Sequence, residues 1–406
     1  MTGGDDPDRH DADGSDGTGI GDEGPGSGDG DLPTGAYLLA LASLPGMTPT
    51  RLLVAVATGR PASTWVDLVG GRQSRVAVLA AALGRDGHEV VAGWRRAASA
   101  TDPATLWQRH VDAGVDVLVP GSPSWPAEDL AGLRAPPLVL CARGGLAALA
   151  HPRVAIVGTR SCTRYGLAVA RGLGEDLAAA GVTVVSGLAL GIDGAAHVGA
   201  LAAAGAPPMA VVAGGLDRVY PPRHRQLWAQ VAATGLVVSE CPLGVEPTPW
   251  RFPARNRLIA ALADVTVVVE SHERGGSLVT AEAAEALQRH VLAVPGPVHS
   301  PASAGTNGLL ADRAGMCRDA DDVLVVLGMT PGARRVGTAA ETDAGVPDGA
   351  AAQVLAALDH EAATIDQLAL RTGLALDDLV VELARLGLDG RVVERAGWYE
   401  RTTRGR

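Results

Sequence analysis

The chain has 406 residues and a formal net charge of −11, with 47% hydrophobic and 19% charged residues. This composition excludes wholesale disorder and allows two or three domains with a large buried core. All 34 basic residues are arginine, because the sequence contains no lysine. Schiff-base, P-loop and kinase-type lysines are therefore excluded, and arginine is the permanent cation that can hold phosphate.

The acidic charge is concentrated near the N-terminus. Residues 1–31 hold ten acids against one arginine, whereas the remaining residues carry 33 arginines against 35 acids. The segment consists mainly of Gly, Asp, Ser and Pro, so burial cannot offset the entropy of ordering it. We predict a disordered acidic tail over 1–31, followed by a nearly neutral body that is compatible with a nucleic-acid partner.

The cysteines and the apolar runs limit the choice of compartment and cofactor. The four cysteines are far apart and form no C-x-x-C pair, so neither a disulfide framework nor a zinc site is indicated. We expect no metal and no other cofactor. The N-terminus lacks a basic start and an apolar h-region, and no apolar run reaches the ~18 residues of a membrane span. These features predict a cytoplasmic protein.

Two kinds of hydrophobic periodicity follow the tail. Apolar residues recur at helical spacing on both sides of a turn at 45–49, which predicts a small helical domain over 32–110. From residue 154 onward, short β-branched runs alternate with alanine-rich amphipathic stretches. Such runs are typical of parallel strands buried on both faces and joined by helical crossovers. We predict an α/β domain with a doubly wound, mostly parallel sheet over 111–328.

A linker and a third domain are predicted near the C-terminus. Residues 329–349 are rich in Gly, Ala, Thr, Asp and Pro and show little periodicity, which is typical of a linker. Three helical stretches and a hairpin predict a winged-helix domain over 350–400. Its candidate recognition helix carries Asp377, Asp378 and Glu382 against Arg385 alone. Because an acidic face repels a phosphate backbone, we interpret this domain as a protein-contact or regulatory module.

The loops after the predicted strands are rich in groups that hold anions. Ligands of open parallel sheets bind beyond the carboxyl ends of the strands, and arginine forks, hydroxyls and glycine backbones at helix N-termini suit phosphate there. No G-x-G-x-x-G fingerprint is present, so NAD binding is not supported. The predicted DNA- or phosphate-binding residues are Gly158, Thr159, Arg160, Ser186, Gly187, Gly191, Gly214, Gly215, Arg223, Arg255, Asn256, Arg257, Gly276 and Ser277.

Each of these residues also has a purely structural interpretation. The glycines suit ordinary turns. The arginines could pair with acids near the strand ends, namely Asp193, Glu240 and Glu270, although three converging forks favour phosphate. Aromatic residues make up only 3% of the chain, yet four lie beside the arginine loops: Tyr165, Tyr220, Trp250 and Phe252. They are candidates for base stacking, above all Tyr165, Tyr220 and Phe252, with core packing as the alternative.

Four motifs in a fixed order indicate a family. They are Gly-Thr-Arg at 158–160, Ser-Gly-Leu-Ala-Leu-Gly-Ile-Asp at 186–193, Arg-Asn-Arg-Leu-Ile at 255–259 and Gly-Ser-Leu-Val-Thr-Ala at 276–281. With these motifs the chain resembles the DprA/Smf family, the DNA-processing proteins of natural transformation. The resemblance implies an extended Rossmann-like, non-enzymatic protein that binds and protects single-stranded DNA, forms a homodimer and loads the RecA recombinase onto the strand. It also implies a helix-hairpin-helix or SAM-like N-terminal domain and a C-terminal winged helix.

Two other functions remain open from the sequence. A nucleotide phosphoribohydrolase of the lysine-decarboxylase-like group carries P-G-G-x-G-T-x-x-E, which residues 275–282 echo without the leading proline and the middle glycine. A nucleotide-sensing regulator would hold a small ligand in the crevice and contact a partner through the winged helix. The sequence offers no triad or activated nucleophile, which favours DNA binding without catalysis.

Overall fold

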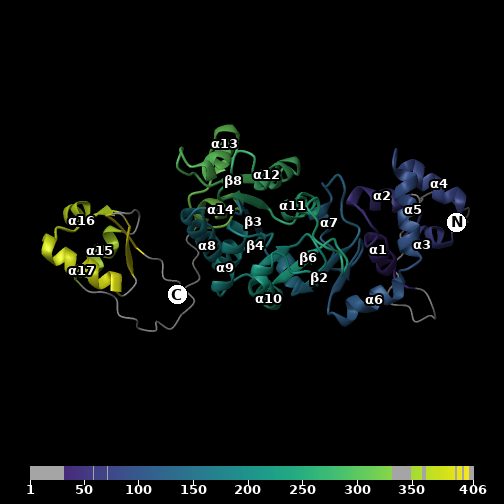
Figure 1. Ribbon diagram of the computed structural model, residues 1–406, viewed down its shortest axis with the longest axis horizontal. Helices are drawn as coiled ribbons and strands as arrows, with labels where there is room; N and C mark the ends of the chain where they lie inside the picture. Colours follow the sequence, from purple (N-terminus) through teal and green to yellow (C-terminus); the bar gives the residue numbers. More distant parts are fainter. Residues whose placement is uncertain are drawn as a thin grey trace, which may run out of the picture. The chain divides into compact units, whose positions relative to one another are not determined.

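The structure is a computed structural model that describes residues 32–57, 59–70, 72–331, 349–358, 363–388, 391–395 and 397–401 (Figure 1). The predicted tail at 1–31 and most of the predicted linker at 329–349 lie outside the described residues. The chain divides into two compact units, Met1–Arg335 and Val336–Arg406.

Helices precede the first strand of the larger unit. They are α1 (Thr34–Ala42), α2 (Pro49–Ala57), α3 (Pro61–Gly70), α4 (Gln73–Ala82), α5 (Gly87–Ala98) and α6 (Pro103–Asp112). Proline opens α2, α3 and α6, where its missing N–H costs nothing. Asp102 caps α6 by accepting from the N–H groups of Ala104 and Thr105. The indole of Trp94 on α5 donates to the carbonyl of Pro45 at 2.9 Å, which fixes the turn between α1 and α2.

The sheet of this unit has nine strands in the order β1-β2-β6-β5-β4-β3-β7-β8-β9. The strands are β1 (Asp116–Leu118), β2 (Leu140–Gly144), β3 (Arg153–Val157), β4 (Thr183–Ser186), β5 (Met209–Val211), β6 (Leu236–Ser239), β7 (Val265–Val268), β8 (His290–Ala293) and β9 (Gly315–Met316). Strand β2 is antiparallel to both of its neighbours, β1 and β6, and the other pairs are parallel. The predicted mostly parallel α/β sheet is confirmed.

Helices cover both faces of the sheet, as Figure 1 shows with α11 and α12 above the strands and α9 and α10 below them. Val154 and Ile156 of β3 pack in one cluster with α8 and α9, whereas Ala155 and Val157 pack in another with α11. This alternation is the strand period of two with both faces buried. The helices that follow α6 in this unit are α7 (Ala127–Leu130), α8 (Arg164–Ala179), α9 (Ile192–Ala202), α10 (Arg225–Thr234), α11 (Arg251–Ala261), α12 (Gly276–Ala286), α13 (Ala304–Asp312) and α14 (Ala320–Val326), with short 3₁₀ turns η1 (Leu146–Ala150), η2 (Pro222–His224) and η3 (Pro301–Ser303).

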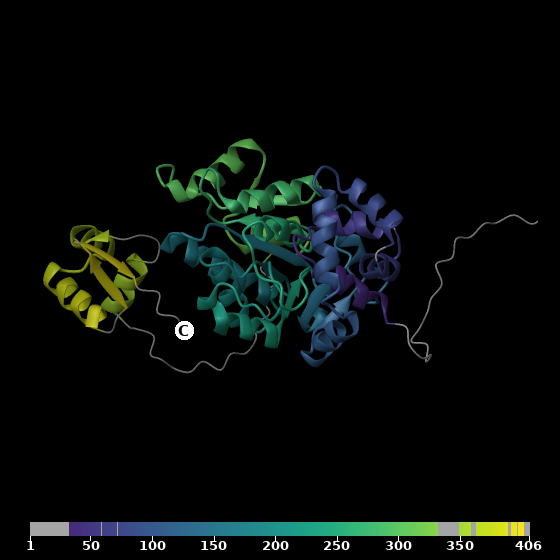
Figure 2. The ribbon, with the colours of Figure 1, turned by 45° about the vertical axis from the view of Figure 1, so that its right-hand side comes forward.

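The N-terminal helices share a hydrophobic core with one end of the sheet. Leu38 and Leu41 of α1 belong to the same buried cluster as Cys141 of β2, Val212 after β5 and Trp228 of α10. Figure 2 shows these purple and blue helices against the end of the sheet that carries β2. The helical part is therefore packed onto the sheet rather than tethered beside it.

The smaller unit contains α15 (Ala350–Ala357), α16 (Ile365–Thr372) and α17 (Leu376–Leu388) with a three-stranded sheet in the order β10-β12-β11. Its strands are β10 (Ala363–Thr364), β11 (Val392–Arg395) and β12 (Trp398–Arg401). A capping box between Thr364 and Gln367 starts α16, and Gly373 ends it at a φ of 69°, where glycine is favoured. Among the described residues, none of the helices in either unit has both the length and the hydropathy that a membrane crossing requires.

Candidate nucleic-acid interface

A pocket of about 460 Å³ lies beyond the carboxyl ends of β4 and β5, and we call it the strand-end pocket. Ligands of doubly wound sheets bind at this edge. The structure brings six of the predicted residues together in its lining: Arg160, Gly187, Gly214, Tyr220, Phe252 and Arg255. The lining also includes Arg218, which the sequence analysis did not select although it follows the end of β5 closely.

Arginine and two aromatic rings form one wall of the strand-end pocket. The guanidinium carbon of Arg160 lies 5.2 Å from the centre of the Phe252 ring, and the Phe252 and Tyr220 ring centres are 5.2 Å apart at a tilt of 49°. Tyr220 is 42% exposed. Arg160 is exposed and makes no hydrogen bond or ion pair with any residue that the structure describes. This wall therefore offers an uncommitted cation beside rings that can stack.

Arg255 lies at the floor of the same pocket and is buried. Its Nη1 donates to the carbonyl of Gly187 at 2.9 Å and to the carbonyl of Val211, and its Nε donates to Asn256. A Cβ atom at position 187 would approach the guanidinium nitrogens to 2.5 Å, so a larger residue there would displace the Arg255 side chain. Burial lowers the pKa of Arg255 to about 10, against the opposing effect of Asp193. The side chain thus remains charged at neutral pH and braces the ends of two strands.

Asp193 accepts a hydrogen bond from the backbone N–H of Gly187, which the sequence analysis had predicted to contact a ligand. Its carboxylate accepts from the N–H groups of Gly187 at 3.1 Å and Ala189 at 3.4 Å. Burial raises the pKa of this carboxyl, and the nearby Arg255 opposes the rise. The carboxylate therefore holds the loop after β4 from inside.

Glu270 has a comparable role at the N-terminus of α8. Its buried carboxylate accepts from the N–H of Thr163 at 2.8 Å and from the hydroxyl of Thr163 at 2.6 Å, and its carbonyl accepts from the N–H of Thr159. A carboxylate at a positive helix end is stabilising. The N–H and hydroxyl donors of Thr163 at the N-terminus of α8 are thus satisfied from within the protein. Gly158, in the loop before α8, packs tightly against Ile192.

Arg257 is turned away from the strand-end pocket and pairs with Glu240. The two side chains are 17% and 18% exposed. Burial raises the pKa of the Glu240 carboxyl, and Arg257 opposes the rise. Of the pairings left open by the sequence, this is the one that the structure forms.

The remaining predicted residues lie outside the lining of the strand-end pocket. Ser186 is buried and donates to the carbonyl of Ile156 at 2.6 Å, and Ser277 is buried and donates to Ser271 at 2.9 Å. Asn256 donates to the carbonyl of Gly276 at 3.3 Å, joining α11 to α12. The others outside the lining are Gly158, Thr159, Gly191, Gly215, Arg223, Gly276 and Tyr165.

Three of these residues have clear local roles or positions. Gly191 adopts a φ of 81° and lies so close to Thr159 that a Cβ would come within 2.5 Å of its carbonyl. Tyr165 donates to the carbonyl of Pro295 at 3.0 Å. Arg223 is exposed on η2. Their contribution to ligand binding stays a prediction.

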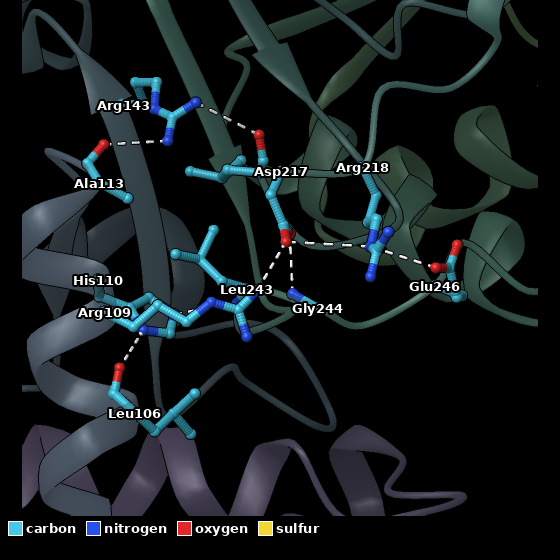
Figure 3. A network of polar contacts seen from close by, with 11 residues as sticks. Leu106, Arg109, His110, Ala113, Arg143, Asp217, Arg218, Leu243, Gly244 and Glu246 are labelled. Atoms are coloured by element: carbon cyan, nitrogen blue, oxygen red, sulfur yellow. Dashed lines mark hydrogen bonds and ion pairs between the residues drawn. The ribbon is translucent and has the colours of Figure 1, made fainter.

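A polar network lies beside the strand-end pocket (Figure 3). Arg109 of α6 pairs with Asp217 at 2.8 Å, and Asp217 also lies 3.9 Å from Arg218. Arg218 in turn pairs with Glu246 at 3.1 Å. Exposed pairs of this kind contribute little to stability, but this network orients the arginine that lines the pocket. Within the described residues, no cluster of three or more His, Cys, Asp and Glu side chains is placed to hold a metal ion.

Comparison with known proteins is consistent with this architecture. The family model for DNA recombination-mediator protein A matches residues 116–328, and the model for the DprA winged helix domain matches residues 338–397. The chain is 41% identical over 315 residues to a DNA processing protein DprA of Mycobacterium tuberculosis, which covers 73% of this chain and 79% of the relative. It is 37% identical to the protein Smf of Escherichia coli over 66% of this chain and 72% of that protein.

A solved structure is also similar. The crystal structure of DNA processing protein A from Streptococcus pneumoniae superposes with a TM-score of 0.58 at 29% identity, covering 72% of this chain and 98% of the other. The predicted family and the predicted winged helix are thereby confirmed. On this evidence the chain belongs to the DprA/Smf family of DNA recombination-mediator proteins.

Proposed function

We propose that this protein binds single-stranded DNA in the strand-end pocket and loads the RecA recombinase onto the bound strand. The observation that carries the binding proposal is the wall formed by Arg160, Phe252 and Tyr220, in which an unpaired guanidinium lies beside two rings. The RecA step rests on membership of the recombination-mediator family. A homodimer, which the family resemblance implies, and a cytoplasmic location, which the cysteine spacing and the apolar runs predict, are part of the proposal.

The chemistry of the pocket favours a single strand over a duplex. Stacking on an aromatic ring requires an unpaired base, and each stacked base contributes about 1–3 kcal/mol with little sequence preference. Arg160 can neutralise a phosphate, and the Arg255 guanidinium, whose charge the nearby Asp193 partly offsets, lies at the pocket floor.

The phosphoribohydrolase alternative has weaker support from the geometry. The glycine turn at 275–276 opens α12 and is not part of the strand-end pocket lining. Glu282, the acid of the echoed motif, is exposed on α12. We therefore propose binding without catalysis. Incubation with nucleoside monophosphates should release neither base nor phosphate, and release that Glu282→Gln abolishes would establish the enzyme instead.

The binding proposal is tested by fluorescence anisotropy with a labelled oligothymidylate and a duplex of the same length across a salt series. The single strand should bind more tightly, and its affinity should fall linearly on a log-log plot against salt. Equal or stronger binding of the duplex would contradict the proposal. RecA loading is tested separately, by following RecA filament formation on a strand already covered by single-strand-binding protein.

A further inference from the structure

We propose a second stacking site for single-stranded DNA, formed by Trp250 and Arg251 at the start of α11, on the side that faces the N-terminal helices. This inference rests on the proposed function, because it extends the same strand beyond the strand-end pocket. It assigns to the helical part of the chain a role in binding DNA.

The first observation is a repeated pairing of arginine with an aromatic ring. The guanidinium carbon of Arg251 lies 4.4 Å from the centre of the Trp250 ring, and Nη1 of Arg251 donates to the sulfur of Cys241 at 3.2 Å. Trp250 is 39% exposed. Phe252, two residues along the chain, makes the same kind of contact with the Arg160 guanidinium in the strand-end pocket. The first residues of α11 thus present the same chemistry in two neighbouring pockets.

The second observation is that pockets continue around the first turn of α11. A bridging pocket of about 480 Å³ shares Val212, Ala213 and Arg255 with the strand-end pocket. It shares Trp250 and Arg251 with a wider outer pocket of about 1020 Å³. The strand-end pocket and the pocket lined by Trp250 therefore lie next to each other at the first turn of α11.

The outer pocket is bounded by both parts of the larger unit. On one side lies the turn between α1 and α2, from Ser43 to Gly46, together with Arg109 of α6. On the other side lie the loop after β6, Trp250 and Arg251. Arg51 donates to the carbonyl of Gly46 at 2.7 Å and adds a cation next to this turn.

The charges along this path suit a phosphate backbone. The first turn of α11 contains no acid, and its N-cap residue, Trp250, makes no side-chain capping hydrogen bond. The backbone N–H of Arg251 donates to the carbonyl of Thr248, so the group that favours an anion at this helix end is the Arg251 guanidinium. The acids that line the two pockets are already neutralised, Glu240 by Arg257 and Glu246 by Arg218. This charge balance, and the position of Trp250 two residues from Phe252 of the first site, point to a nucleic-acid strand as the occupant.

The test is a length series of oligothymidylates with the full chain and the variants Trp250→Ala and Arg251→Ala. The affinity of Trp250→Ala for the shortest oligonucleotide that the parent binds should be unchanged. For longer oligonucleotides its affinity should fall by roughly 5- to 150-fold, the equivalent of one stacked base. Arg251→Ala should reduce the slope of log affinity against log salt concentration by about 0.7, and only with long oligonucleotides.

Three comparisons make the result decisive. Trp250→Phe should recover most of the loss because a ring remains, and Trp398→Ala, which removes a tryptophan of similar exposure in the smaller unit, should change nothing. If Trp250→Ala and Arg251→Ala bind every length like the parent, or lose affinity equally at all lengths, the inference is wrong. If the parent itself fails to bind any oligothymidylate, the proposed function fails first.

Discussion

The imidazole of His110 accepts a hydrogen bond from the backbone N–H of Leu243 at 3.0 Å (Figure 3). Its other nitrogen, Nδ1, donates to the carbonyl of Leu106 at 2.8 Å. His110 is fully buried, and burial lowers its pKa below the usual 6.5. This neutral ring ties α6 to the loop after β6, which borders the outer pocket. A protonated ring could not accept the bond from Leu243.

The first prediction is a pH-dependent loss of stability caused by His110. The pKa is lower in the folded protein than in the unfolded chain, so the unfolded chain takes up the proton first as the pH falls. Stability from this group is fully present above the unfolded pKa of 6.5 and declines below it, by at most about 1.4 kcal/mol per pH unit. Of the facing groups, Arg109 opposes protonation and Asp217 favours it.

Urea unfolding between about pH 7.5 and pH 5.5 measures this effect. The control is His110→Gln, whose amide can donate to Leu106 and accept from Leu243 but does not titrate in this range. The variant should show a flatter dependence of the unfolding free energy on pH. Identical slopes for the parent and the variant would show that His110 is not the titrating group.

The second prediction concerns Arg160. Arg160→Ala should weaken binding of single-stranded DNA and reduce the log-log salt slope by about 0.7, because one phosphate contact is lost. The free energy of unfolding should fall by less than ~1 kcal/mol, since only an exposed contact with Phe252 is removed. Arg160→Lys should recover part of the affinity. The matched control is Arg134→Ala, which removes an exposed arginine outside all of the pockets described above. If Arg160→Ala binds single-stranded DNA with the same affinity and the same salt dependence as the parent, Arg160 does not contact the DNA.

The third prediction is that Arg255→Ala destabilises the fold. The change removes the stronger of the two cationic influences on the buried carboxylate of Asp193, and it removes the donor to the carbonyls of Gly187 and Val211. Removing one partner from a buried charged cluster costs roughly 3–5 kcal/mol. Urea unfolding at pH 7 measures the loss, and Arg160→Ala provides the comparison at the same pocket. An Arg255→Ala variant as stable as the parent would contradict this structural role.

The fourth prediction separates Arg257 from the DNA path. Arg257→Ala leaves the carboxylate of Glu240, whose side chain is only 18% exposed, without its partner and should lower the free energy of unfolding. Glu240→Gln in the same chain should restore part of the loss, because a neutral amide tolerates burial better than a carboxylate. A double-mutant cycle in urea measures the coupling. Arg257→Ala should reduce DNA affinity less than Arg160→Ala does. A larger loss of affinity in Arg257→Ala would show that Arg257 contacts DNA.

Sequence patterns were sufficient to predict the sheet, but they did not predict which partners its charged and polar side chains would contact. Short β-branched runs predicted strands buried on both faces, and the clusters on either side of Val154 and Ala155 have that arrangement. The strand-end loops also pointed to the edge of the sheet at which the strand-end pocket lies. The partners of the arginines depend on side-chain directions between elements far apart in sequence, such as Arg257 and Glu240. No local spacing encodes such a contact, and none indicates that Glu270 fills the N-terminus of α8.

The last prediction concerns the winged helix. Deleting residues 336–406 should leave the affinity for single-stranded DNA within about twofold of the parent value at a given salt concentration. The unit has its own hydrophobic core, and its α17 exposes Leu376, Val380 and Val381 beside Asp377 and Asp378. Acids repel phosphates, whereas exposed apolar side chains suit a protein partner. Anisotropy with oligothymidylate measures the affinity, and thermal melting checks that the larger unit keeps its fold. A large loss of affinity in a folded truncation would show that the winged helix contacts DNA despite its acidic face.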